Sequence, residues 1–201
     1  ESVLQIAPSA AAAYSLRSLT GGDPKVVRVR RDTGGGAGDN DEQDFTASGI
    51  SSGALVDFVG SGNDGFVETW YDQSGNNRDS TQTTAARQPI IVEAGVFQDG
   101  LKFTHTDTTN GKRLFVPVTS ANLGAFTLVY VGKVTVSHNS INTILGATRG
   151  VVSYATGTIG LCINSSTGTI SVVNEVTTSE RVIKTNTSLN TTLNEDFVAF
   201  A

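Results

Sequence analysis

The spacing of apolar residues divides this 201-residue chain near residue 89. Before that point two segments carry a helical pattern. Residues 9–19 combine a capping serine, an alanine run and two leucines that continue one apolar stripe, and residues 52–59 place their apolar side chains on one side. We therefore expect short N-terminal helices near residues 9–19 and 52–59.

Strand patterns account for most of the remaining chain. Residues 25–31 (KVVRVRR) and 65–71 (GFVETWY) alternate, and from residue 89 onward short β-branched runs are separated by turns rich in Gly, Asn, Ser and Thr. This spacing is typical of a β-sandwich. We expect a mainly β chain in which residues 1–201 form one antiparallel β-sandwich domain and residues 1–88 are its helix-containing N-terminal elaboration. The strand-like end of the sequence also predicts a longer polypeptide that continues past Ala201.

Composition narrows the class of protein. The formal net charge is -5, whereas nucleic-acid-binding domains are usually basic, so we expect no nucleic-acid partner. No apolar run approaches the ~20 residues that span a bilayer, so we expect no membrane partner. Cys162 is the single cysteine and therefore has no internal disulfide partner; we expect it to be a small core residue.

Three arginines form the one basic cluster, at residues 28, 30 and 31. On a strand, Arg28 and Arg30 share one face, and the valines between and before them share the other. We expect these arginines either to lie on an exposed edge or to form internal ion pairs with the aspartates that follow, which are Asp32, Asp39 and Asp41.

Residues 69–82, TWYDQSGNNRDSTQ, are the most informative segment for function. An aromatic pair runs into turn-forming polar residues. Aromatic faces pack on sugar C–H groups, and Asp, Asn and Gln match hydroxyl donors and acceptors. The candidate carbohydrate-binding residues are Trp70, Tyr71, Asp72, Gln73, Asn76 and Asn77. The same residues also fit a strand and a turn whose side chains bond their own backbone. In either case strand alternation predicts that the two aromatic rings point to opposite faces, one into the core and one toward the surface.

The same segment carries a family resemblance. WYDQSGN followed by TQ and ARQP resembles the catalytic-domain signature of the α-L-arabinofuranosidase B family, glycoside hydrolase family 54. Upstream, AAAYSLRSL (11–19), VVRVRRD (26–32) and DFTASG (44–49) resemble arabinofuranosidase-B-like domains of bacteriophage and prophage structural proteins. The resemblance covers roughly the first ninety residues and implies a concanavalin-A-like β-sandwich, or jelly roll, and a carbohydrate context.

The function that we expect from this resemblance is that of a phage virion surface protein: a fibre, spike or decoration component with a lectin-like domain. Its expected partners are a host cell-surface glycan, other virion proteins and further copies of itself, and its expected location is the virion surface. One alternative is a bacterial surface or secreted adhesion module, located outside the cell or on its surface.

Hydrolysis is a second alternative, and it needs two carboxyl groups across the scissile bond. The candidates are Glu68, Asp72, Asp79, Glu175, Glu195 and Asp196, and because no spacing singles out a pair we assign no catalytic residue. We expect no cofactor, with calcium as the alternative, because Asp72, Ser74, Asn76 and Asp79 place oxygens at a spacing similar to that of a calcium loop.

Overall fold

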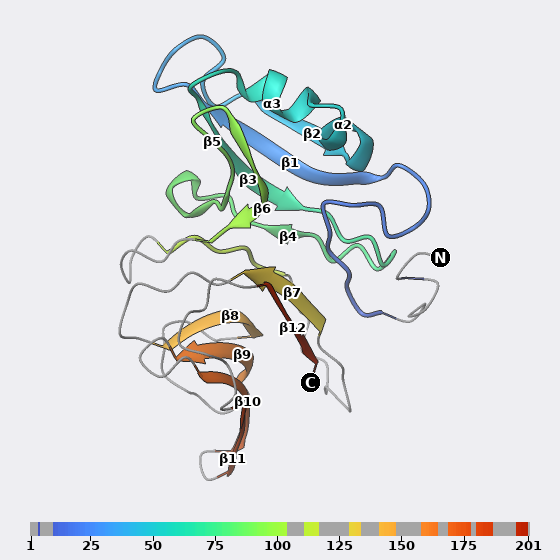
Figure 1. Ribbon diagram of the computed structural model, residues 1–201, viewed down its shortest axis with the longest axis vertical. Coiled ribbons are helices and arrows are strands. Elements are labelled where there is room, and N and C mark those ends of the chain that lie inside the picture. Colours follow the sequence, from blue (N-terminus) through green and yellow to red (C-terminus); the bar gives the residue numbers. More distant parts are fainter. Residues whose placement is uncertain are drawn as a thin grey trace. The chain divides into compact units, whose positions relative to one another are not determined.

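The computed structural model describes Leu4, residues 10–103 and 111–116, and the backbone of six strands between residues 129 and 200. The chain divides into two compact units, residues 1–121 and 122–201. In both units the described strands pair antiparallel (Figure 1). The prediction of a mainly β, antiparallel chain with few short helices is confirmed.

A six-stranded sheet organises the first unit, in the order β2-β1-β3-β5-β6, with β4 paired to β3. Its elements are β1 (Lys25–Asp32), β2 (Glu42–Thr46), α2 (Ala47–Ser51), α3 (Ala54–Val59), β3 (Asp64–Trp70), β4 (Ser80–Thr81), the 3₁₀ helix η1 (Ala85–Arg87), β5 (Ile90–Glu93) and β6 (Val96–Lys102). Because β3 pairs with β5, the sheet continues across residue 89, where the sequence pattern changes. Residues 1–88 therefore supply β1 to β4 as well as the helices.

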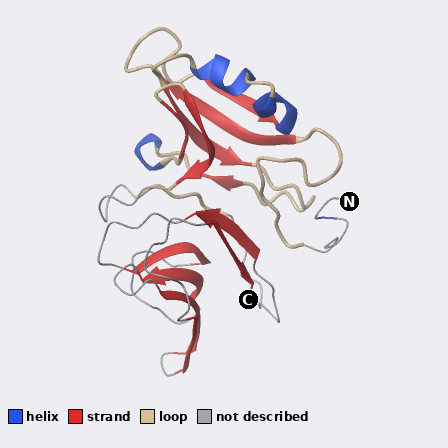
Figure 2. Ribbon diagram, viewed as in Figure 1, coloured by secondary structure: helices blue, strands red, loops and turns tan. Residues whose placement is uncertain are grey.

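Helices α2 and α3 cover one face of this sheet (Figure 2). The core beneath them is aliphatic: Leu55 and Val59 of α3 are fully buried with Val29 and Val67 of the sheet. Gly65 lets α3 approach closely, since a Cβ at this position would lie 2.8 Å from Val59 Cγ2. The helix expected at 52–59 is confirmed as α3, and α2 precedes it.

The second unit contains two groups of strands. β7 (Val129–Lys133) pairs with β12 (Asp196–Phe200). β8 (Ile141–Ala147), β9 (Thr158–Asn164), β10 (Thr169–Thr177) and β11 (Glu180–Asn186) form a sheet in the order β11-β10-β9-β8. These strands lie in apolar runs where the sequence predicts them. Cys162 falls in β9, but its side chain lies outside the described residues.

The helix expected near residues 9–19 is wrong for the part that the structure describes. Residues 10–19 form bends and irregular backbone. The reason lies in the hydrogen bonds that this segment makes with the WYDQSGN motif, which are given below. None of the helices among the described residues combines the length and apolar character needed to cross a membrane.

Candidate functional site

Trp70 and Tyr71 stand at the end of β3 and have different partners. The Trp70 ring packs against the aliphatic core and against the Tyr14 ring, with centroids 5.5 Å apart. The Tyr71 hydroxyl instead donates to Asp44 Oδ1 at 2.8 Å, and its main-chain N–H donates to the Val26 carbonyl. The two rings thus have separate environments, as strand alternation predicts, although both are half-buried.

Asp72 directs both of its carboxylate oxygens into the protein. Oδ1 accepts hydrogen bonds from the main-chain N–H groups of Ala13 (2.8 Å) and Ser74 (2.9 Å), and Oδ2 accepts from Ser74 Oγ (2.8 Å) and the Arg78 N–H (3.1 Å). A carboxylate offers about four acceptor sites, so these contacts fill Asp72. Partial burial acts to raise the pKa of Asp72, but these hydrogen bonds outweigh it and the net shift is downward.

Gln73 is 6% exposed and hydrogen-bonds to main-chain atoms between residues 13 and 19. Its Oε1 accepts from the Leu19 N–H at 2.8 Å, and its Nε2 donates to the carbonyls of Ser15 (2.9 Å) and Arg17 (3.0 Å). Its main-chain N–H donates to the Ala13 carbonyl. Both amide donors of the buried side chain are therefore satisfied, as a buried amide requires.

Asn76 adds a third attachment. Its Nδ2 lies 3.0 Å from the Ala10 carbonyl oxygen and 3.2 Å from that of Ala11. The adjacent Asn77 is exposed, has a positive φ of 54°, and its side chain has no hydrogen bond among the described residues. Of the six candidate residues, Asp72, Gln73 and Asn76 thus hydrogen-bond to residues 10–19, and Tyr71 hydrogen-bonds to Asp44. Trp70 packs against the core, and Asn77 is exposed.

We call Asp72, Gln73 and Asn76 the clasp, and residues 10–19 the strap. The clasp hydrogen-bonds main-chain N–H and C=O groups of the strap, which an α-helix would pair with one another. This explains why the alanine-rich strap is not helical: long-range hydrogen bonds override the local helix propensity. The contacts agree with the structural interpretation of the motif.

The residues considered for calcium take part in the same network. Asp79 Oδ1 accepts the Asp72 N–H at 2.9 Å, and Ser74 Oγ donates to Asp72. A calcium ion here would have to replace hydrogen bonds that hold the strap. Within the described part of the chain, no three His, Cys, Asp or Glu residues gather in a way that would hold a metal.

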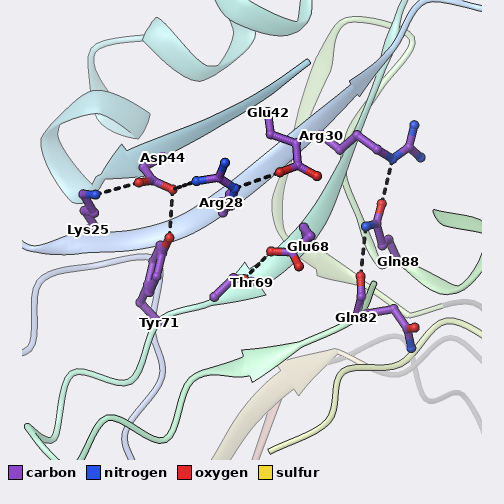
Figure 3. Close-up of polar contacts among 10 residues, drawn as sticks. All are labelled: Lys25, Arg28, Arg30, Glu42, Asp44, Glu68, Thr69, Tyr71, Gln82 and Gln88. Carbon is purple, nitrogen blue, oxygen red and sulfur yellow. Dashed lines mark hydrogen bonds and ion pairs between the residues drawn. The ribbon is translucent and has the colours of Figure 1, made fainter. Parts of the chain in front are cut away.

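A second polar cluster lies along β1 and β2, and Figure 3 shows its side chains. We call it the charged face and define it as Lys25, Arg28, Glu42, Asp44 and Tyr71. Lys25 Nζ lies 2.6 Å from Asp44 Oδ2, while Arg28 bonds both Glu42 (2.9 Å) and Asp44 (3.1 Å). Because neighbours on a strand alternate, Asp44 points away from the buried Phe45, and so the charged face lies opposite α2 and α3.

The predicted ion pairs of the arginine cluster are confirmed in part. Arg31 pairs with Asp41 at 2.5 Å, and Arg30 lies 3.5 Å from Asp32. Asp39 instead accepts the Thr33 N–H. The arginines are on an inner strand, since β1 lies between β2 and β3. The partners of Arg28 were not predicted. The alternation of EQD at residues 42–44 was the available signal, because in a β1–β2 hairpin it places two carboxylates opposite the arginines of RVR at residues 28–30.

Arg30 is buried beside the charged face. Its side chain is 8% exposed and packs over the Phe66 ring, with its guanidinium carbon 4.9 Å from the centroid. Its Nε donates to Gln88 Oε1 at 2.8 Å, and Gln88 Nε2 donates to the Gln82 carbonyl at 2.9 Å (Figure 3). These hydrogen bonds link Arg30 of β1 to residues 82 and 88, which lie between β4 and β5.

Two groups of the charged face, Asp44 and Tyr71, have pKa values that their surroundings shift in opposite directions. Partial burial acts to raise the pKa of Asp44, but hydrogen bonds from Lys25 and Tyr71 and the charges of Lys25 and Arg28 give a net downward shift. Burial, together with the hydrogen bond to Asp44 and its charge, raises the pKa of Tyr71 to about 12. Asp44 therefore stays a carboxylate and Tyr71 a neutral phenol.

Comparison with family models, curated proteins and solved structures finds no match for this chain. The resemblance of its motifs to the arabinofuranosidase B family therefore stays a prediction. The function must be inferred from the two polar clusters and from the motifs themselves.

Proposed function

We propose that this chain is a phage virion surface protein, a fibre, spike or decoration component, with a lectin-like domain that binds a host cell-surface glycan through the charged face. Its domain is a concanavalin-A-like β-sandwich, or jelly roll. The proposal joins the motif resemblance to one structural observation, which is the group of acidic and basic side chains around the half-buried Tyr71 on the sheet face opposite α2 and α3.

The chemistry of the charged face suits sugar hydroxyls. Carboxylates accept hydroxyl protons, the guanidinium of Arg28 donates, and the Tyr71 ring offers an apolar face. The side chains of Arg28 and Glu42 are 37% and 34% exposed, so they reach solvent despite their mutual hydrogen bond. Because each group is already held by a partner, less side-chain entropy is lost when a ligand binds.

We propose that the chain binds glycan without hydrolysing it. A glycosidase needs a carboxylic acid whose pKa is raised, opposite a second carboxylate. The aspartates of the described region whose pKa is shifted are Asp23, Asp39, Asp44 and Asp72, and every shift is downward. Such groups are poor proton donors at neutral pH.

The test measures binding of the full chain to immobilised lipopolysaccharide, capsular polysaccharide and arabinan by biolayer interferometry. We expect one of these polysaccharides to bind and Tyr71→Ala to weaken that binding at least tenfold, about 1.4 kcal/mol, with Glu42→Gln weakening it as well. Asp57→Asn is the matched control, because Asp57 is an exposed carboxylate on α3, over the opposite sheet face. If Tyr71→Ala and Glu42→Gln both bind as tightly as the Asp57→Asn control, the charged face is not the site.

The two alternatives have their own readouts. Release of nitrophenol from an aryl α-L-arabinofuranoside, lost on Glu68→Gln, would replace the binding proposal with a hydrolase. For the adhesion module, the decisive observation is location: antibody labelling of phage particles supports the virion protein, whereas labelling of bacterial cells without phage supports the adhesion module.

A further inference from the structure

The clasp recognises the strap mainly through peptide groups. Asp72 accepts the Ala13 N–H, Gln73 pairs with main-chain atoms of Ser15, Arg17 and Leu19, and Asn76 approaches two alanine carbonyls. Every one of these partners is a backbone atom. The arrangement is that of a binding site for an irregular, extended peptide.

One side chain of the strap adds a specific contact. The Tyr14 ring lies against Trp70, and its hydroxyl donates a hydrogen bond to the Arg78 carbonyl. The strap thus combines one aromatic anchor with a series of main-chain hydrogen bonds. This combination resembles the way in which a separate peptide ligand is held by its backbone and by one side-chain pocket.

An exposed link joins the strap to the sheet. Thr20, Gly21, Gly22 and Asp23 are all exposed, and the chain bends there before Pro24 leads into β1. Gly21 has a φ of +82° with no atom within 4 Å of its Cβ position. A glycine link of this kind can change direction at little steric cost, so the strap, whose Leu16 packs against the core, can leave the body by a change of direction at Gly21.

We propose that the clasp is an intermolecular docking site, which accepts the strap of a second copy of this chain. Two copies then exchange residues 10–19, and each clasp forms the same hydrogen bonds with its partner's strap as it forms with its own. Exchange of an identical element is a low-cost route to a dimer, because no new interface has to be built. The inference is independent of glycan binding.

The first experiment mixes two full-length variants. Chain one carries Asp72→Ala and Gln73→Ala, so its strap is intact and its clasp is broken; chain two carries Tyr14→Ala, so its clasp is intact and its strap is weakened. By native mass spectrometry we expect wild-type dimers, mainly monomers for each variant alone, and heterodimers on co-expression. Asn77→Gly is the matched control, since Asn77 neighbours the clasp without bonding the strap and glycine tolerates its positive φ of 54°, and it should dimerise like wild type. A wild-type chain that is monomeric at all concentrations, or variants that dimerise alone as wild type does, would overturn the proposal.

A disulfide trap keeps the proposal testable if the clasp variant fails to fold. One chain carries Ala11→Cys and the other Asn76→Cys, because Asn76 Nδ2 lies 3.2 Å from the Ala11 carbonyl oxygen. Both chains also carry Cys162→Ser, which removes the native thiol. Oxidation of the co-expressed chains should give a cross-linked dimer containing one of each. Replacing Asn76→Cys by Asp57→Cys, at an exposed site on α3, should abolish the cross-link. Equal yields from the two pairs would indicate random collision and overturn the exchange.

Discussion

The Tyr14 ring lies against the Trp70 ring with centroids 5.5 Å apart and planes tilted by 43°. Tyr14 is the only aromatic residue of the strap, and Trp70 is the only tryptophan in the chain. The contact therefore joins the strap to the last residue of β3. It also places the single tryptophan where its fluorescence reports whether the strap is bound.

Tyr14→Ala should release the strap from Trp70. We expect a red shift of tryptophan emission and a loss of about 2 kcal/mol of unfolding free energy, since a half-buried aromatic ring is removed. Urea unfolding followed by fluorescence and by circular dichroism gives both values. Tyr14→Phe keeps the ring and should retain most of the stability; an unchanged emission maximum in Tyr14→Ala would contradict the contact.

Asp72→Ala should destabilise the first unit even where no sugar is bound. The substitution leaves the N–H groups of Ala13, Ser74 and Arg78 without their acceptor, and we expect a loss of about 2–3 kcal/mol. Asn77→Gly in the same turn removes the side chain and keeps a residue that tolerates the positive φ of 54°, and it should change the unfolding free energy by less than about 0.5 kcal/mol. If both substitutions behave alike in a urea titration, the clasp does not hold the strap.

Acid should weaken the same attachment. The folded-state pKa of Asp72 is depressed below the ordinary value of 3.8, so its contribution is complete above the unfolded pKa. The contribution is lost as the pH falls from about 4 through the lower folded pKa. We expect the melting temperature of wild type to drop over this window and that of Asp72→Asn to start lower and to drop less. Parallel curves for the two proteins would show that Asp72 carries no pH-dependent stability.

Gly65→Ala should disturb the packing of α3 on the sheet. The new Cβ would lie 2.8 Å from Val59 Cγ2 and 3.2 Å from Val92 Cβ, both in the buried core, and overpacking of this kind costs about 1–3 kcal/mol. Gly100→Ala is the matched control, because nothing lies within 4 Å of its Cβ position. Thermal unfolding by circular dichroism should separate the two variants by several degrees.

Sequence patterns predicted the elements whose cause is local. The alternation of residues 25–31 and 65–71 gave β1 and β3, and the one-sided apolar residues of 52–59 gave α3, because burial of one face follows directly from periodicity. Ion pairs of the arginine cluster with Asp32 and Asp41 were one of the two predicted alternatives, since these aspartates are close along the chain, but which arginine meets which aspartate was not predicted.

Features that depend on distant partners were missed. The strap was predicted as a helix because its alanines favour one, but the groups that decide its conformation are on Asp72, Gln73 and Asn76, far along the chain. Likewise, Arg28 meets Asp44 only through the β1–β2 register, and propensity contains no information about register. The assignment of the six candidate residues to carbohydrate binding stays a prediction, and the contacts of Asp72, Gln73 and Asn76 with the strap required three-dimensional coordinates.

Recognition of peptide groups has a consequence for how this protein can vary. The clasp bonds to atoms that every residue except proline possesses, so residues 10, 11 and 13 of the strap can change widely while the attachment persists. Positions 14 and 16 are exceptions, because the Tyr14 ring fills the space beside Trp70 and Leu16 packs against the core. Proteins built in this way would share the turn after β3, an aromatic residue at position 14 and an apolar residue at position 16, and would differ at most other positions of the strap.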